Sequence, residues 1–201
     1  MIRRLLWAAV LATLGAGVVG ALRQRREVVL ATRARSRPVA GTATAAPATT
    51  PPRQGPLGRR LAGWVPAQPR TRAGQLAALA WASPLTAVGL LVAVVSGGRP
   101  RWRDDLGCFV TEQVQGASAF ALRLVGAEAN AIGHVVLSRQ ATASPALLAH
   151  EAVHVRQAER LGPLLFPVYL WLSARYGYRH HPMEQAARRG ARQAIDDAPT
   201  G

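Results

Sequence analysis

The sequence contains one cysteine, ten acidic residues and no lysine among its 201 residues. Because Cys108 has no partner, an internal disulfide is excluded, and so is a Cys-x-x-Cys pair of the redox or zinc-finger type. A phosphate-binding glycine loop and a serine–histidine nucleophile pair are also absent from the sequence. All 25 basic residues are arginine, which indicates a GC-rich coding sequence before it indicates any function.

The few acidic residues are distributed very unevenly along the chain. Residues 1–103 contain 16 arginines and one acid, Glu27, whereas residues 104–201 contain nine arginines and nine acids. The net charge of +15 therefore belongs to the first half of the chain, and the second half is neutral. A basic nucleic-acid-binding face is not expected in the second half, so nucleic acid is an unlikely partner.

Two long uncharged runs lie within the basic half, at residues 5–22 and 73–98. Each is long enough to cross the roughly 30 Å hydrocarbon core of a bilayer. For residues 1–22 we expect an uncleaved membrane helix, with a secretory signal as the rival interpretation. For residues 73–98 we expect a membrane helix, with a buried core helix as the alternative.

The segment between the two runs, residues 23–72, is rich in arginine, alanine, proline and threonine. Such a composition cannot bury a core, so we expect a disordered linker. Its eleven arginines favour the cytoplasmic side of a bacterial cytoplasmic membrane. If both runs span, the C-terminal domain then lies on the extracytoplasmic side.

The most informative motif is His150-Glu151-Ala152-Val153-His154. On a helix, His150 and His154 lie one turn apart on the same face, so both imidazoles can reach one metal ion. Glu151 lies next to the first of them, where a carboxylate can accept a proton from a metal-bound water. The motif predicts a zinc-dependent hydrolase with Glu151 as its general base.

The sequence around this motif predicts the helix that such chemistry requires. Ser144 and Pro145 are typical of an N-cap followed by proline at the first helical position. Gly162 and Pro163 form a stop signal. Between them, apolar positions recur at helical spacing. Arg156 and Gln157 fall away from the ligand face, so we expect them on the surface.

A catalytic zinc site usually has three protein ligands, and the third must come from another segment. Glu184 is the preferred candidate, because Pro182 marks the start of a second helix and a carboxylate in the first turn is favoured by the helix dipole. Ala186 and Ala187 would let this helix approach the first one closely. His180 and His181 are rival third ligands.

The pattern His150-Glu151-x-x-His154 with Glu184 downstream resembles the gluzincin class of zinc metallopeptidases. The stretches 133–139, 149–157, 162–164 and 178–184 are also similar to a set of small bacterial zincin-like proteins, over roughly residues 76–195. Where that group usually has Asn-Pro-Phe-Glu, this chain has His181-Pro182-Met183-Glu184. The resemblance implies His150, His154 and Glu184 as metal ligands and Glu151 as general base, and it implies no particular substrate.

The remaining pattern predicts an α+β fold: a mainly helical zincin-like domain over residues 99–195 with a small antiparallel sheet. Three short strands are expected at 108–114, 119–125 and 131–137, and a core helix at 161–174. A disordered tail is expected at 196–201. His134 is expected to pack in the core or to contact a metal ligand without binding the metal itself. Tyr176 and Tyr178 are expected to have a capping or packing role.

These observations predict a membrane-associated zinc metallopeptidase that binds Zn²⁺ and acts on a peptide or protein substrate. The alternative is a catalytically silent zincin-like scaffold or interaction module held at the membrane.

Overall fold

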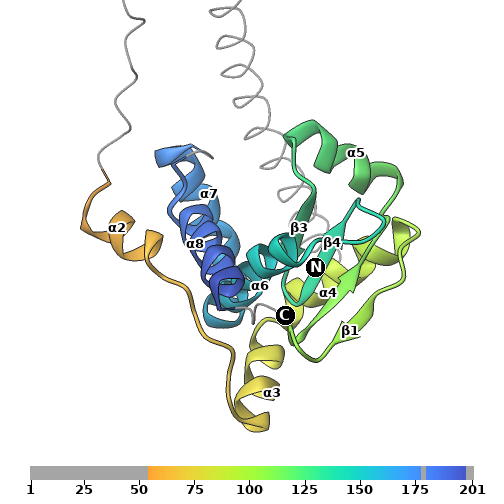
Figure 1. Cartoon of the computed structure of the whole chain (residues 1–201), viewed down its shortest axis with the longest axis horizontal. Coiled ribbons are helices and arrows are strands. Elements are labelled where there is room, and N and C mark those ends of the chain that lie inside the picture. Colours follow the sequence, from red (N-terminus) through yellow and green to blue (C-terminus); the bar gives the residue numbers. More distant parts are fainter. Residues whose placement is uncertain (1–53, 178–179, 198–201) are drawn as a thin grey trace, which may run out of the picture.

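The computed structural model describes residues 54–177 and 180–197 (Figure 1). The first apolar run, most of the expected linker, Tyr178 and the last four residues lie outside the described residues. The described part is a mixed helix and sheet structure, which agrees with the predicted α+β class.

The sheet has four strands in the order β1-β2-β4-β3. Their bounds are Arg101–Arg103, Cys108–Thr111, Ala129–Ile132 and Val135–Ser138 for β1 to β4. Strands β1 and β2 are antiparallel, as are β3 and β4, but β2 and β4 run parallel, with Val110 opposite Val136. The prediction of an antiparallel sheet was therefore wrong at its centre. A parallel pair needs a long crossover, and the segment between β2 and β4 provides it.

That crossover contains helix α5, Gly116–Val125, where the sequence analysis placed a strand. Alternating apolar residues favoured the strand, but Ala119 and Leu122 are the buried pair, spaced as on one helical face, while Phe120 is 65% exposed. The helix ends at Gly126, whose φ of 71° suits a glycine C-cap. Helical spacing and the terminating glycine outweigh the period-two pattern.

Helices cover both faces of the sheet. Val136 faces α6, Pro145–Leu161, in a buried cluster that includes Val155 and Leu148. Its neighbours Val135 and Leu137 point to the opposite face and join a cluster with Ala93 of helix α4, Ser83–Val95. The alternation along β4 thus separates the layer containing α6 from the layer containing α4.

The second uncharged run forms two helices, α3 at Arg72–Trp81 and α4 at Ser83–Val95. Within the described residues, no single helix is long and apolar enough to cross a membrane. Only α3 and α4 taken together meet that length and composition, and they are bent by 73° at their junction. The expected linker 23–72 also contains structure near its end, because helix α2, Pro56–Ala62, packs against helix α8, Pro182–Asp196.

The C-terminal region follows the predicted sequence of helices. Ser144 accepts a hydrogen bond from the Leu147 amide at 3.3 Å, which confirms the predicted N-cap of α6. A short 3₁₀ turn, Gly162–Leu164, leads into α7, Leu165–Tyr176, and then α8, Pro182–Asp196. Helix α7 lies where a core helix was expected, but Leu172 is its one fully buried side chain.

Close packing between α4 and the sheet predicts a large cost for added volume at Gly89. A Cβ atom there would lie 2.6 Å from the Ile132 carbonyl oxygen and 2.8 Å from the Val135 Cβ. We expect overpacking in Gly89→Ala to lower the free energy of unfolding by about 1–3 kcal/mol. The higher helix propensity of alanine offsets roughly 1 kcal/mol of this loss. Urea denaturation measures the difference.

The matched control adds volume to the other side of the same helix. Ala87 is exposed, so Ala87→Met should change the free energy of unfolding by no more than about 0.5 kcal/mol. Equal stabilities for the Gly89→Ala variant and the unchanged protein would contradict the packing described for α4.

Candidate metal centre

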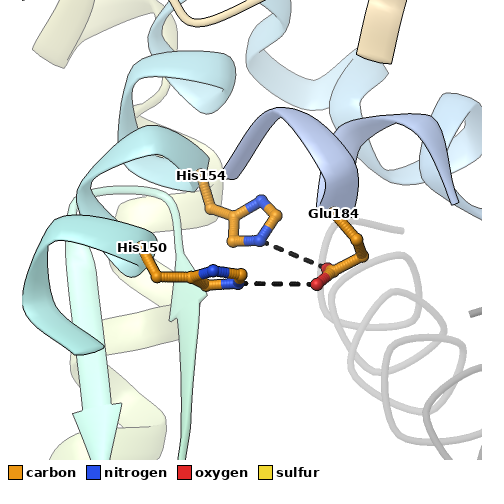
Figure 2. Close-up of side chains that lie close together, drawn as sticks. All are labelled: His150, His154 and Glu184. Carbon is orange, nitrogen blue, oxygen red and sulfur yellow. Dashed lines mark ion pairs between the residues drawn. The ribbon is translucent and has the colours of Figure 1, made fainter. Parts of the chain in front are cut away.

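Helices α6 and α8 bring three side chains to one point (Figure 2). His150 and His154 lie one turn apart on α6, with their ring centroids 5.1 Å apart. Glu184 comes from the first turn of α8 and is 4% exposed. The ligand atoms of the three residues all lie within 4.8 Å of one another.

Two of the distances between these atoms are close to those in a tetrahedral metal site. The His154 Nε2 atom lies 3.2 Å from Glu184 Oε1, and the His150 Nε2 atom lies 3.5 Å from Glu184 Oε2. Bonds of about 2.0–2.1 Å at tetrahedral angles place neighbouring ligand atoms about 3.3–3.4 Å apart. Glu184 Oε2 is buried, and the contact described for it is the long ion pair with the His150 ring. This group could therefore hold a metal ion.

Small residues allow α8 to reach α6. Ala186 and Ala187 are fully buried, as expected for a close helix pair. Gly190 matters as well, because a Cβ atom there would lie 2.6 Å from the Val153 Cγ2 atom. A side chain at Gly190 would thus push α8, and with it Glu184, away from the histidines.

The rival ligands do not join the group found among the described residues. His181 is fully buried, its Nε2 atom lies 3.1 Å from the Tyr169 carbonyl oxygen, and its ring lies against the Tyr169 ring with centroids 4.1 Å apart. His180 contributes its backbone oxygen, which accepts hydrogen bonds from Gln54 and Gln185. Glu184 is the third member, as the sequence analysis preferred.

Two further residues orient the group. Gln157 Oε1 lies 3.0 Å from His154 Nδ1, so that nitrogen can donate a hydrogen and leave Nε2 free to bind a metal. The Tyr169 hydroxyl donates to Glu184 Oε1 at 2.8 Å. The expectation that Gln157 lies on the surface was wrong, because its side chain is fully buried. Its position three residues after His154 was the signal that could have revealed this role.

Glu184 and His154 each stabilise the charged form of the other. Burial raises the pKa of Glu184, but the attraction of His154 and hydrogen bonds with both histidines outweigh it and hold this pKa well below its usual range. Burial likewise lowers the pKa of His154, but the charge of Glu184 and the hydrogen bond with it raise this pKa to about 9. A buried carboxylate that stays ionised beside two imidazoles is a suitable cation ligand.

Glu151 has different surroundings from Glu184. Burial raises its pKa, and the charges of His154 and His150 only partly oppose this. Its Oε2 atom is buried and has no hydrogen-bond partner. The side chain is thus a carboxyl group with increased proton affinity, close enough to both histidines to be influenced by their charges.

The Gln157 contact yields a prediction about metal affinity. Replacing Gln157 with Met keeps the volume of the side chain but removes the acceptor that fixes the His154 tautomer. We expect the affinity for zinc to fall about 10–100-fold, as measured by competition with a chelator. Arg192→Met, on the exposed part of α8, is the control and should bind zinc as the unchanged protein does. Equal affinity in both variants would rule out the orienting role.

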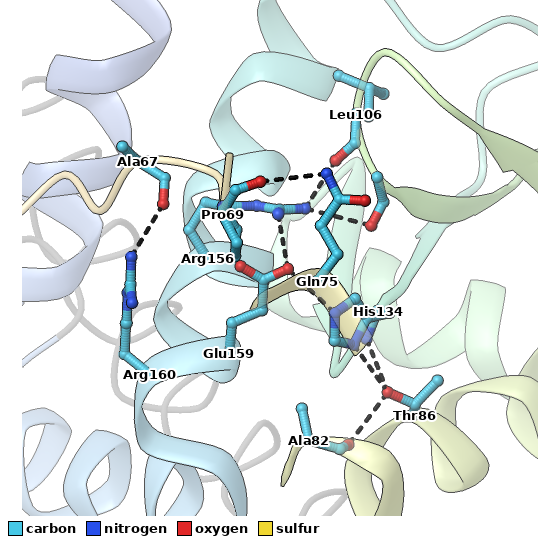
Figure 3. Close-up of polar contacts among 11 residues, drawn as sticks. Ala67, Pro69, Gln75, Ala82, Thr86, Leu106, His134, Arg156, Glu159 and Arg160 are labelled. Carbon is cyan, nitrogen blue, oxygen red and sulfur yellow. Dashed lines mark hydrogen bonds and ion pairs between the residues drawn. The ribbon is translucent and has the colours of Figure 1, made fainter. Parts of the chain in front are cut away.

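The opposite face of α6 contains a separate buried network (Figure 3). His134 lies 3.1 Å from Glu159 Oε1 through Nε2 and 3.1 Å from the Thr86 hydroxyl through Nδ1. Arg156 pairs with Glu159 at 2.6 Å and donates to the Leu106 carbonyl at 2.7 Å. Thus His134 has the packing role that was expected, whereas Arg156 is buried and the surface expectation for it was wrong.

Comparisons with protein-family models, with curated proteins and with solved structures find no match for this chain.

Proposed function

We propose that the protein is a zinc-dependent peptide hydrolase associated with a membrane. The observation that carries the proposal is the convergence of His150, His154 and Glu184 from two helices. Two imidazoles and one carboxylate are a donor set that zinc prefers in catalytic sites, where three protein ligands leave a fourth position for water. The resemblance to gluzincins supports the same assignment.

Each residue then has a defined task. His150 and His154 would hold the ion through their imidazole nitrogens, and Glu184 would hold it through its carboxylate, to which the Tyr169 hydroxyl donates a hydrogen bond. When bound, zinc supplies acidification of a water molecule and polarisation of the scissile carbonyl. Glu151 would accept a proton from the attacking water and later donate it to the leaving amine. Its raised pKa favours retention of the proton between these two transfers.

The membrane association is proposed from the two uncharged runs and the arginines around them. The neutral charge of residues 104–201 favours a peptide or protein substrate over nucleic acid.

The test combines metal content with activity. We expect the purified full-length chain to contain about one zinc per molecule, in line with a three-ligand site, and to cleave a peptide library. Treatment with a chelator should abolish the cleavage, and added zinc should restore it. Bound zinc without any cleavage would contradict the enzyme and favour the scaffold alternative.

A further inference from the structure

Helix α4 has an exposed face that is apolar along its whole length. The helix contains no charged residue, and its buried positions Thr86, Gly89 and Ala93 face the sheet. On the opposite side, Leu91, Val94 and Val95 are 59%, 62% and 73% exposed. A surface helix usually has a polar outer face, and a helix that is apolar all round is usually covered on all sides.

The chain around this apolar face is basic. Residues 54–103 contain seven arginines and no acidic residue. Arg99 lies four residues after the end of α4, and its side chain is exposed. Among the described residues, Arg99 forms no ion pair, whereas Arg103 pairs with Asp105. An apolar strip that ends close to an unpaired arginine, in a segment without acidic residues, is complementary to an anionic phospholipid surface.

The shape of α3 and α4 favours contact along the surface. Helix α4 has 13 residues and is about 20 Å long, shorter than the roughly 30 Å hydrocarbon core. One side of it is fixed to the sheet, and α3 leaves it at 73°. We infer that the outer face of α4 binds an anionic phospholipid bilayer, with Leu91, Val94 and Val95 in the acyl region and Arg99 at the headgroups.

This binding mode also sets the orientation of the metal centre. Helix α4 covers one face of the sheet and α6 covers the other, so His150 and His154 lie on the side away from the bilayer. The outer face of α4 thus specifies how the domain contacts the membrane, and this inference rests on the membrane association proposed above. It does not depend on hydrolysis.

The experiment measures the depth of one spin label in the full-length chain. A nitroxide is attached at Leu91→Cys or, as the matched control, at Trp171→Cys, an exposed aromatic of α7. Cys108 is buried, and burial raises the pKa of its thiol to about 11, so it should not compete for the label. The protein is reconstituted into vesicles of phosphatidylcholine with or without phosphatidylglycerol. Collisions with oxygen report acyl chains, and collisions with a water-soluble nickel chelate report water.

We expect the oxygen-to-nickel collision ratio at Leu91 to be several-fold higher than at Trp171 in vesicles that contain phosphatidylglycerol. Arg99→Gln should reduce that ratio. Low collision rates with both reagents at Leu91 would overturn the inference, because they would show that protein covers the face: residues 5–22 or a second copy of the chain. Equal ratios at the two positions would overturn it as well. Peptide cleavage, measured on the same samples, separates this outcome from a failure of the proposed enzyme.

Discussion

Glu151→Gln should reduce peptide hydrolysis by about 10²–10⁴-fold while leaving the metal in place. The amide has nearly the shape of the carboxyl group but cannot accept the proton of the attacking water, and a positioned general base contributes about this much to the rate. Glu151 is not a member of the metal-binding group, so zinc content should stay at the level of the unchanged protein. Steady-state kinetics on a cleaved peptide, together with metal analysis, measure both quantities.

The control for this variant is another buried acid on the same helix. Glu159 lies on the opposite face of α6, where it pairs with Arg156 and His134. Glu159→Gln should lower stability, since it weakens a buried ion pair, but its activity per folded molecule should stay close to that of the unchanged protein. If Glu151→Gln and Glu159→Gln retain the same activity per folded molecule, Glu151 is not the general base.

Glu184→Ala should abolish zinc binding at micromolar metal. Removing a residue that only orients a ligand typically lowers metal affinity 10–100-fold. Removing a ligand itself should therefore lower the affinity for zinc by more than about 100-fold. The two histidines also lose the buried carboxylate that attracts a cation between them. Competition with a chromophoric chelator gives the affinity, and circular dichroism reports whether the helices remain.

His180→Ala is the matched control, because this residue was a rival ligand and lies only four positions before Glu184. Its backbone oxygen, not its side chain, makes the described hydrogen bonds. The variant should therefore bind zinc with unchanged affinity. A loss of zinc in His180→Ala with retention in Glu184→Ala would reverse the ligand assignment.

Local signals in the sequence were sufficient to predict the parts that form the candidate metal centre. Ser144 and Pro145 correctly marked the start of α6, and Pro182 marked the start of α8. The spacing of His150 and His154 then fixed their common face, and the first-turn position of Glu184 indicated where a carboxylate is favoured. Each of these features depends on residues within one or two helical turns, so no knowledge of tertiary contacts was needed.

The errors arose where tertiary contacts decide the structure. The residues of α5 alternate as in a strand, but the buried pair Ala119 and Leu122 packs as a helical face. Gln157 was assigned to the surface from its angle on α6, yet packing covers it completely. The residues 73–98 have the composition of a membrane span, but they bend between α3 and α4. Composition and periodicity do not reveal which other segment covers a given face.

The central claim is that His150, His154 and Glu184 bind one zinc ion, and X-ray absorption at the zinc edge tests it most directly. For the full-length protein loaded with one equivalent of zinc, we predict two imidazole nitrogens and oxygen ligands at about 2.0–2.2 Å, with no sulfur. The Glu184→Ala variant should lose this spectrum. A spectrum without imidazole scattering, or one that is unchanged in Glu184→Ala, would contradict the account.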